Sequence, residues 1–176
     1  MAVTINGNGT VTGLSALPSS AMASKTVIQS KCTPTNTEAQ ASTSSDTYTD
    51  ITGIDLLFTP LFANSTIILI TFTAQIRLNP DAEGYVGIYY SPNSNMSSPV
   101  ILDPVRGASR NESFRVNSND GDAHHFWTIT QTTWDTTVSN TNARYYSVGG
   151  YRSNNENIYY GDQGVGLTMM AQEIKT

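Results

Sequence analysis

Hydrophobic and polar positions alternate along much of this chain with the period of two that is typical of β-strands. The alternation is longest in residues 67–78, where Ile68, Ile70, Phe72, Ala74, Ile76 and Leu78 share one face. Thr71, Thr73, Gln75 and Arg77 fall on the other face. The pattern therefore predicts a long strand with one buried and one wetted face, ended by Pro80 because proline cannot donate to a β-ladder.

Shorter runs predict more strands, and turn residues separate them at intervals of roughly ten residues. These strands are expected over residues 25–33, 48–51, 54–59, 86–90, 100–102, 113–116, 124–133, 144–151, 157–161 and 165–174. No segment shows a convincing helical period. We therefore expect an all-β protein, an antiparallel β-sandwich or jelly roll of about 8–10 strands, with a barrel as the alternative. Residues 34–45, rich in Thr and Ser, are expected to form a mobile loop.

The first fourteen residues form a separate pattern. Two β-prone runs, Val3–Ile5 and Thr10–Thr12, flank an Asn-Gly-Asn-Gly turn that favours a tight hairpin. A two-stranded hairpin is at best marginally stable alone in water, so we expect it to dock onto another surface. The candidate docking residues are Ile5, Asn6, Gly7, Asn8, Gly9, Val11 and Leu14. We divide the chain into a docking arm with its linker, residues 1–24, and a β-sandwich domain, residues 25–176.

Composition and charge narrow the classes of function. Only 13 % of the residues are charged, the net charge is −5, and Thr, Ser and Asn make up about a third of the chain. Nucleic-acid and anionic-membrane binding both need a basic surface, which the sequence does not offer. The single cysteine, Cys32, excludes an internal disulfide and a cysteine-based zinc cluster. No apolar stretch is long enough for a membrane span, and residues 1–23 do not resemble a secretory signal, so we expect neither membrane insertion nor export by that route.

Several blocks, in this order, resemble a known family. They are Ser44-Ser45-Asp46-Thr47-Tyr48-Thr49-Asp50-Ile51-Thr52-Gly53-Ile54, then Phe58-Thr59-Pro60, then Ser65-Thr66-Ile67-Ile68-Leu69-Ile70. This order is similar to that of small β-sandwich virion proteins, of structural or tail-fibre type, from tailed phages of marine bacteria, cyanophages among them. Residues 5–13, 143–148 and 167–174 resemble the opening arm, a late strand and the last strand of that family. Residues 81–125 match none of its members, and Ser65-Thr66 stands where relatives often carry Ser-Lys.

The resemblance implies a non-enzymatic virion subunit of fibre, appendage or head-decoration type. It implies a homo-oligomer, a trimer by analogy with similar phage fibres, that docks to other virion proteins through its arm. The implied location is the virion, assembled in the cytoplasm of a host bacterium. Because the family pattern is lost in residues 81–125, no ligand is carried over from it.

Candidate chemistry is sparse. Asn119, Asp120 and Asp122 carry oxygens that could bind Ca²⁺, but the same run has the composition of a hairpin turn, and both readings stay open. The adjacent His124 and His125 would point to opposite faces of a strand and could not share a metal. Carboxylates suited to glycoside hydrolysis are scattered over polar loops, which is typical of a solvated surface: Asp81, Glu83, Asp103 and Glu112. We expect no catalytic site, no cofactor and no metal.

Aromatic residues of the exposed type are numerous for a small domain. Tyrosine and tryptophan suit subunit interfaces and sugar stacking, although cross-strand packing explains many of them. The candidates for glycan or interface contacts are Tyr89, Trp134, Tyr151 and Tyr159. They give an alternative function, a module at a fibre tip that binds a glycan receptor on the host.

Overall fold

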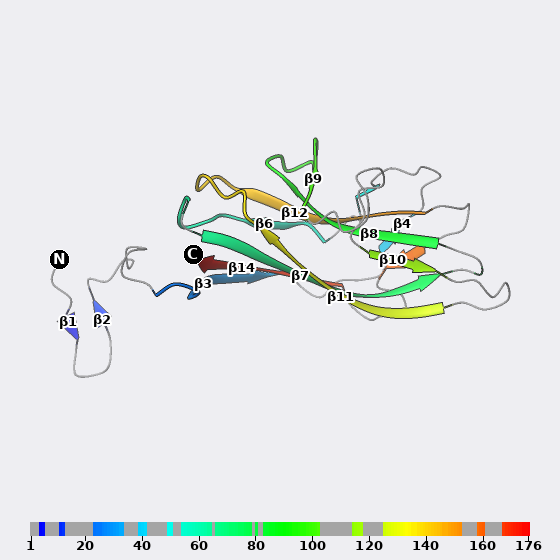
Figure 1. Cartoon of the computed structure of the whole chain (residues 1–176), viewed down its shortest axis with the longest axis horizontal. Coiled ribbons are helices and arrows are strands. Elements are labelled where there is room, and N and C mark those ends of the chain that lie inside the picture. The colour runs from blue at the N-terminus through cyan, green and yellow to red at the C-terminus, as the bar shows by residue number, and fades with distance from the viewer. Residues whose placement is uncertain are drawn as a thin grey trace.

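The computed structural model contains only β-strands as regular elements in the part of the chain that it describes. That part comprises residues 4–5, 11–12, 23–33, 39–41, 49–50, 54–64, 66–78, 80, 83–102, 114–117, 125–152, 158–160 and 167–176. Its strands form two antiparallel sheets packed face to face as an open β-sandwich, together with a separate two-stranded sheet (Figure 1). The all-β class and the sandwich architecture predicted from the alternation are thus confirmed.

The first large sheet is built on the longest strand, β7. On one side residues 68–78 of β7 pair with β11, and on the other side β7 pairs first with β14 and then with β13. Farther from β7, β3 pairs with β14 and β4 pairs with β13. The strands are β7 (Thr66–Leu78), β11 (His125–Asp135), β14 (Thr168–Lys175), β13 (Ile158–Tyr160), β3 (Val27–Cys32) and β4 (Ala39–Ala41). Because β14 and β13 lie on the same side of β7, with β3 and β4 beyond them, this sheet of six strands is only four strands wide.

The second large sheet is built in the same way. Its central strands β8 and β12 pair with each other, β9 and β10 flank β8, and β5 and β6 flank β12. The strands are β8 (Glu83–Ser91), β12 (Arg144–Arg152), β9 (Val100–Ile101), β10 (Phe114–Asn117), β5 (Thr49–Asp50) and β6 (Leu56–Phe58). This sheet is also four strands wide, because β9 and β10 pair with β8 and β5 and β6 pair with β12.

The hydrophobic core lies between the two sheets. Along β7, buried and half-buried residues alternate over all thirteen positions, and the six apolar residues predicted for the buried face are at most 1 % exposed. The second sheet contributes Val86, Ile88, Tyr146 and Val148 from its central strands. The period-two pattern therefore predicted which residues of β7 enter the core.

The arm pattern is also present in the backbone. β1 (Thr4–Ile5) pairs antiparallel with β2 (Val11–Thr12), with Ile5 opposite Val11. Figure 1 shows these two strands beyond the end of the sandwich at which β14 ends. The candidate docking residues Asn6, Gly7, Asn8, Gly9 and Leu14 lie outside the described residues.

Two expectations need adjustment. The described residues contain fourteen strands, more than the 8–10 predicted, and seven of them have only two or three residues. Residues 34–45, expected to form a loop, contain β4, whose sequence Ala-Gln-Ala carries no β-branched or aromatic residue. β4 forms because β13 offers a backbone to pair with, so tertiary pairing overrides local propensity there.

Candidate functional site

The middle of the outer face of the first sheet is lined with threonines. The Oγ1 atoms of Thr71 and Thr132 lie 3.3 Å apart across β7 and β11, and those of Thr73 and Thr130 lie 3.2 Å apart. Cross-strand threonine pairs of this kind stabilise a sheet modestly and leave its surface polar. This part of the face needs no partner to satisfy its side chains.

Towards the start of β7 the same face becomes apolar. Leu69 of β7 lies opposite Trp134 of β11. On the other side of β7, Ile67 lies opposite Ile174 of β14, and Ile174 in turn lies opposite Val27 of β3. Opposite residues in a sheet share a face, so these five side chains form one surface, here called the Trp134 patch. Trp134 is 47 % exposed and Val27 is 48 % exposed. An exposed cluster of this kind at one end of a sheet is typical of an interaction surface.

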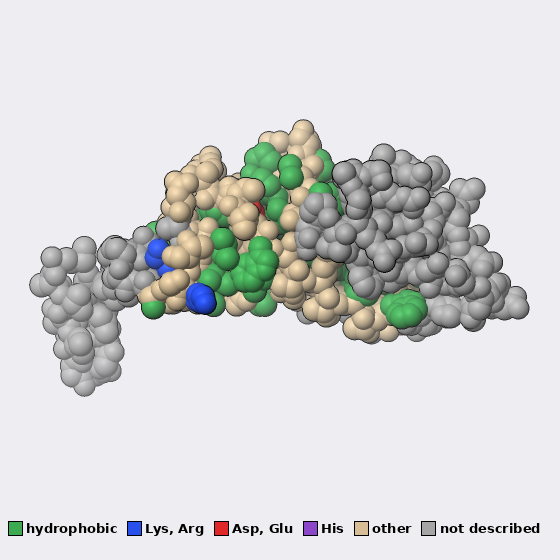
Figure 2. Space-filling model, viewed as in Figure 1, with side chains coloured by type: hydrophobic (Ala, Val, Ile, Leu, Met, Phe, Trp, Pro, Cys, Tyr) green, Lys and Arg blue, Asp and Glu red, His purple; other side chains and the backbone are tan. Residues whose placement is uncertain are grey.

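A mainly apolar hollow of about 520 Å³ opens beside this patch. Two of the three lysines of the chain, Lys25 and Lys175, stand at its rim. A backbone hydrogen bond ties the turn before β3 to the end of β14, since Lys25 N donates to Lys175 O at 2.7 Å. Figure 2 shows apolar side chains next to lysine or arginine side chains at this end of the molecule. The hollow is lined by Ser24, Lys25, Ile67, Trp134, Ile174, Lys175 and Thr176. The site therefore combines an apolar floor with a cationic rim.

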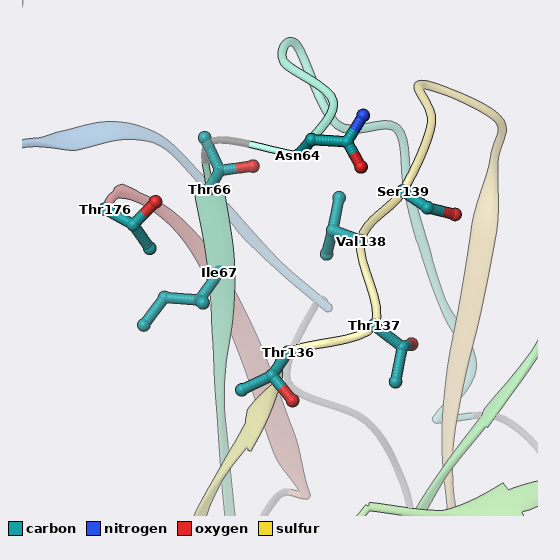
Figure 3. A pocket seen from close by; sticks show the side chains of 8 residues that line it. All are labelled: Asn64, Thr66, Ile67, Thr136, Thr137, Val138, Ser139 and Thr176. Atoms are coloured by element: carbon teal, nitrogen blue, oxygen red, sulfur yellow. The ribbon is translucent and has the colours of Figure 1, made fainter.

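A second, polar hollow of about 380 Å³ shares Ile67 and Thr176 with the first (Figure 3). It lies between the start of β7 and the connection from β11 to β12, and Asn64 N donates to Val138 O across it at 3.1 Å. Its lining is Asn64, Thr66, Ile67, Thr136, Thr137, Val138, Ser139 and Thr176. Hydroxyl and amide groups predominate, which can bind polar ligands by hydrogen bonds but offer no general acid or base.

Beneath the second hollow a buried ion pair joins the two sheets. Arg144 of β12 contacts Asp135 of β11 through Nη2 at 2.7 Å and Nε at 2.8 Å. The Tyr146 hydroxyl donates to the same Asp135 carboxylate at 2.7 Å, and Arg144 Nη2 donates to Thr137 Oγ1 at 2.7 Å. The guanidinium also lies 3.7 Å from the centre of the Tyr90 ring. These contacts fix the 136–139 connection that forms one wall of the hollow.

The network shifts the ionisation of its members. Burial raises the pKa of Tyr146, and the neighbouring Asp135 carboxylate raises it further. Burial would lower the pKa of Arg144, but Tyr146, Asp135 and Tyr90 outweigh it, so the pKa rises. The tyrosine therefore stays neutral and the arginine stays charged at ordinary pH, which suits a structural pair.

Glu173 fixes the other wall. This carboxylate is fully buried and accepts hydrogen bonds from Leu61 N at 2.9 Å, Phe62 N at 3.0 Å and Gln29 Nε2 at 2.7 Å. Two backbone donors of the turn after β6 are satisfied in this way, as buried amides require. The turn that carries Asn64 is thus tied to β14.

One acidic pair lies on the second sheet. The Ser147 hydroxyl donates to Asp50, and Asp55 lies close enough to interact with both residues. Partial burial raises the pKa of Asp55, and the Asp50 charge adds to this effect, while the Ser147 hydroxyl opposes it. Among the described residues no group of three or more His, Cys, Asp or Glu could hold a metal ion.

The four candidate aromatics do not form one site. Trp134 lies in the Trp134 patch, whereas Tyr159 of β13 lies opposite Arg77, whose guanidinium is 3.9 Å from the centre of the tyrosine ring. Leu69 and Arg77, the β7 partners of Trp134 and Tyr159, are eight residues apart, which is about 26 Å along a strand. Tyr89 is only 3 % exposed, so a surface role for it does not fit this fold. Tyr151 belongs to β12, but its side chain lies outside the described residues.

The acidic and histidine candidates receive no structural account. Asp120, Asp122 and His124 lie outside the described residues, as do Asp81, Asp103 and Glu112 and the side chains of Glu83 and His125. The two readings of residues 119–122, a hairpin turn or a Ca²⁺ site, therefore both stay open.

Sequence reasoning missed the two lysines and the two isoleucines of the site. A signal was present, because Ile67 and Leu69 are apolar at positions of β7 where the rest of that face carries Thr, Gln and Arg. Apolar residues on the solvent-facing side of an amphipathic strand indicate that this side is covered or contacts a partner.

Comparison with protein-family models and with curated proteins finds no match for this chain. The described part of the chain also contains no helix long and apolar enough to cross a membrane.

Proposed function

We propose that this protein is a non-enzymatic structural subunit of a tailed-phage virion, of fibre, appendage or head-decoration type. It assembles with copies of itself, as a trimer in the simplest arrangement, and docks to the particle through its amino-terminal arm. Its place would be the virion, after assembly in the cytoplasm of the host bacterium. The proposal rests on the sequence resemblance described above together with one structural observation.

That observation is the isolation of the hairpin. Among the described strands, β1 and β2 pair only with each other, while every other strand joins one of the two large sheets. A two-stranded hairpin has too little buried surface to be stable alone, so a partner surface is required. The sandwich, by contrast, has a closed core. An arm that needs a partner on a body that folds without one is the arrangement of an assembling subunit.

Light scattering of the purified full chain tests this proposal. We expect a defined oligomer whose mass falls to that of one chain when Val11 is replaced by Asp, because a charge on the hairpin opposes burial of its apolar face. A full chain that stays monomeric at all accessible concentrations would contradict the proposal. A map of an intact particle containing this chain would show the virion location directly.

Host-glycan binding is the second candidate, and the exposure of two tryptophans favours it. Trp127 is 45 % exposed and Trp134 is 47 % exposed, at the two ends of β11. The indole ring of Trp134, which shares the outer face of β11 with Thr130 and Thr132, could stack on a sugar ring while the threonines hydrogen-bond its hydroxyls. A glycan array should then show saturable binding that Trp134→Ala abolishes, and an array without signal would count against this candidate.

A further inference from the structure

We propose that the Trp134 patch is the docking site for the amino-terminal arm, residues 1–14, of a second copy of this chain. This inference rests on the proposed function, because it takes assembly through the arm as given and adds the surface that receives it. The partner is therefore another molecule of the same protein.

The patch has the properties of a receiving surface. Val27 and Trp134 are about half exposed, and with Ile67, Leu69 and Ile174 they form one apolar surface beside a hollow of about 520 Å³. Grooves that bind apolar segments have this combination of an aromatic anchor and a concave apolar floor.

The position of the arm favours a second copy. Ser24 and Lys25 line the hollow, so the chain leaves the sandwich at its rim. β1 and β2 lie beyond that end of the sandwich (Figure 1). Residues 13–22 could span up to about 33 Å when extended, so the length of the chain does not confine the arm to its own copy. Two copies that meet at this end could therefore exchange arms.

The charges favour the arm, rather than the Trp134 patch of a second copy, as the occupant of the Trp134 patch. Two of the three lysines of the chain, Lys25 and Lys175, line the hollow beside the patch. Two patches placed face to face would bring like charges together, which is unfavourable. Residues 1–24 contain no Asp, Glu, Lys or Arg, so the arm meets the lysine rim without repulsion.

The register of the hairpin pairs its two apolar residues with each other. Ile5 lies opposite Val11, and Thr4 lies opposite Thr12. The pairing of Ile5 with Val11 makes this part of the arm the one suited to an apolar patch.

The two tryptophans provide a matched pair of reporters. In Trp127→Phe the only indole is Trp134 in the patch, and in Trp134→Phe it is Trp127 at the far end of β11. We expect the emission of Trp134 to shift to shorter wavelength, and its quenching by acrylamide to fall several-fold, as protein concentration rises through the assembly range. The emission of Trp127 should not change.

Variants in the arm then identify the occupant. Val11→Asp should abolish the concentration-dependent shift of Trp134, whereas Thr12→Asp, which adds the same charge at a polar position of the hairpin, should retain it. In the chain with both tryptophans, Trp134→Ala should weaken assembly measured by light scattering at least about tenfold, and Trp127→Ala should not.

The outcomes separate this inference from the proposed function. Assembly that proceeds while Trp134 stays accessible, or that tolerates Trp134→Ala, overturns the patch as the docking site and leaves self-assembly intact. Shielding of Trp134 that is independent of concentration and lost in Val11→Asp shows that the arm binds its own chain, which also overturns the inference. A full chain that never assembles contradicts the proposed function itself.

Discussion

Asp135 and Arg144 form a buried ion pair between the two sheets, with side chains 0 % and 4 % exposed. Such a pair repays its desolvation only when its geometry is good and its other polar atoms are satisfied, and here Tyr146 and Thr137 complete the set. Its value lies in the rigid placement of the 136–139 connection. No local pattern in the sequence indicates this pairing, because the two residues meet only when the sheets stack.

Replacing Arg144 with Met should therefore destabilise the protein strongly. The substitution leaves the Asp135 carboxylate buried without its cation, which typically costs about 3–5 kcal/mol of the free energy of unfolding. Urea unfolding followed by far-ultraviolet circular dichroism measures the loss. Asp135→Asn in the same chain should restore part of it, since it removes the uncompensated charge. A loss below about 1 kcal/mol would show that the carboxylate finds another partner or water.

Asp55 makes stability depend on pH in the opposite direction from a salt-bridged carboxylate. Its folded pKa is raised above 3.8, first by partial burial and then by Asp50, so the folded state holds the proton more tightly than the unfolded chain does. Its contribution to stability is greatest below pH 3.8 and is lost as pH rises through the raised value.

Asp55→Asn should consequently raise the melting temperature near neutral pH and have little effect at about pH 3, where the aspartate is already protonated in both states. Thermal unfolding of both proteins across this range measures the difference. If the difference in melting temperature between the variant and the parent is the same at both pH values, the pKa of the Asp55 carboxyl is not perturbed in the fold.

At the scale of elements, β7 shows how far a strand can be read from its residues. Its thirteen residues alternate as the pattern predicts, and its predicted apolar face is the observed core face. β4 has three residues and no β-branched or aromatic side chain, and its existence depends on β13, the strand beside it. Tertiary pairing, which a single sequence does not display, decides such elements.

Two neighbouring positions of β7 should separate the core from the Trp134 patch. Ile70→Ala removes a fully buried side chain and should cost about 2–5 kcal/mol of the free energy of unfolding. Leu69→Ala lies on the half-exposed outer face and should cost less than about half as much, while weakening assembly. Urea unfolding and light scattering on both variants measure the two effects. Equal losses of stability would show that the outer face is packed within the monomer.

At the scale of the whole molecule, the core could be predicted from the sequence and the site only in part. Trp134 and the hairpin residues Ile5 and Val11 were identified from composition and pattern. Their connection to Lys25, Ile67 and Ile174 depends on the order of strands in the first sheet, with β11 and β14 on opposite sides of β7. That order places residues 67, 134 and 174 on one surface although they are far apart in the chain.

The same arrangement predicts how salt affects assembly. Each chain carries a net charge of −5, so copies repel one another at low ionic strength, while the proposed contact is between an uncharged arm and an apolar surface. Raising the ionic strength from about 0.01 M to about 0.1 M shortens the screening length from about 30 Å to about 10 Å and weakens that repulsion. The assembled fraction measured by light scattering at fixed protein concentration should therefore increase with salt. A contact held by ion pairs, such as the lysine rim on an acidic partner surface, would respond in the opposite direction, because salt would screen the attraction instead.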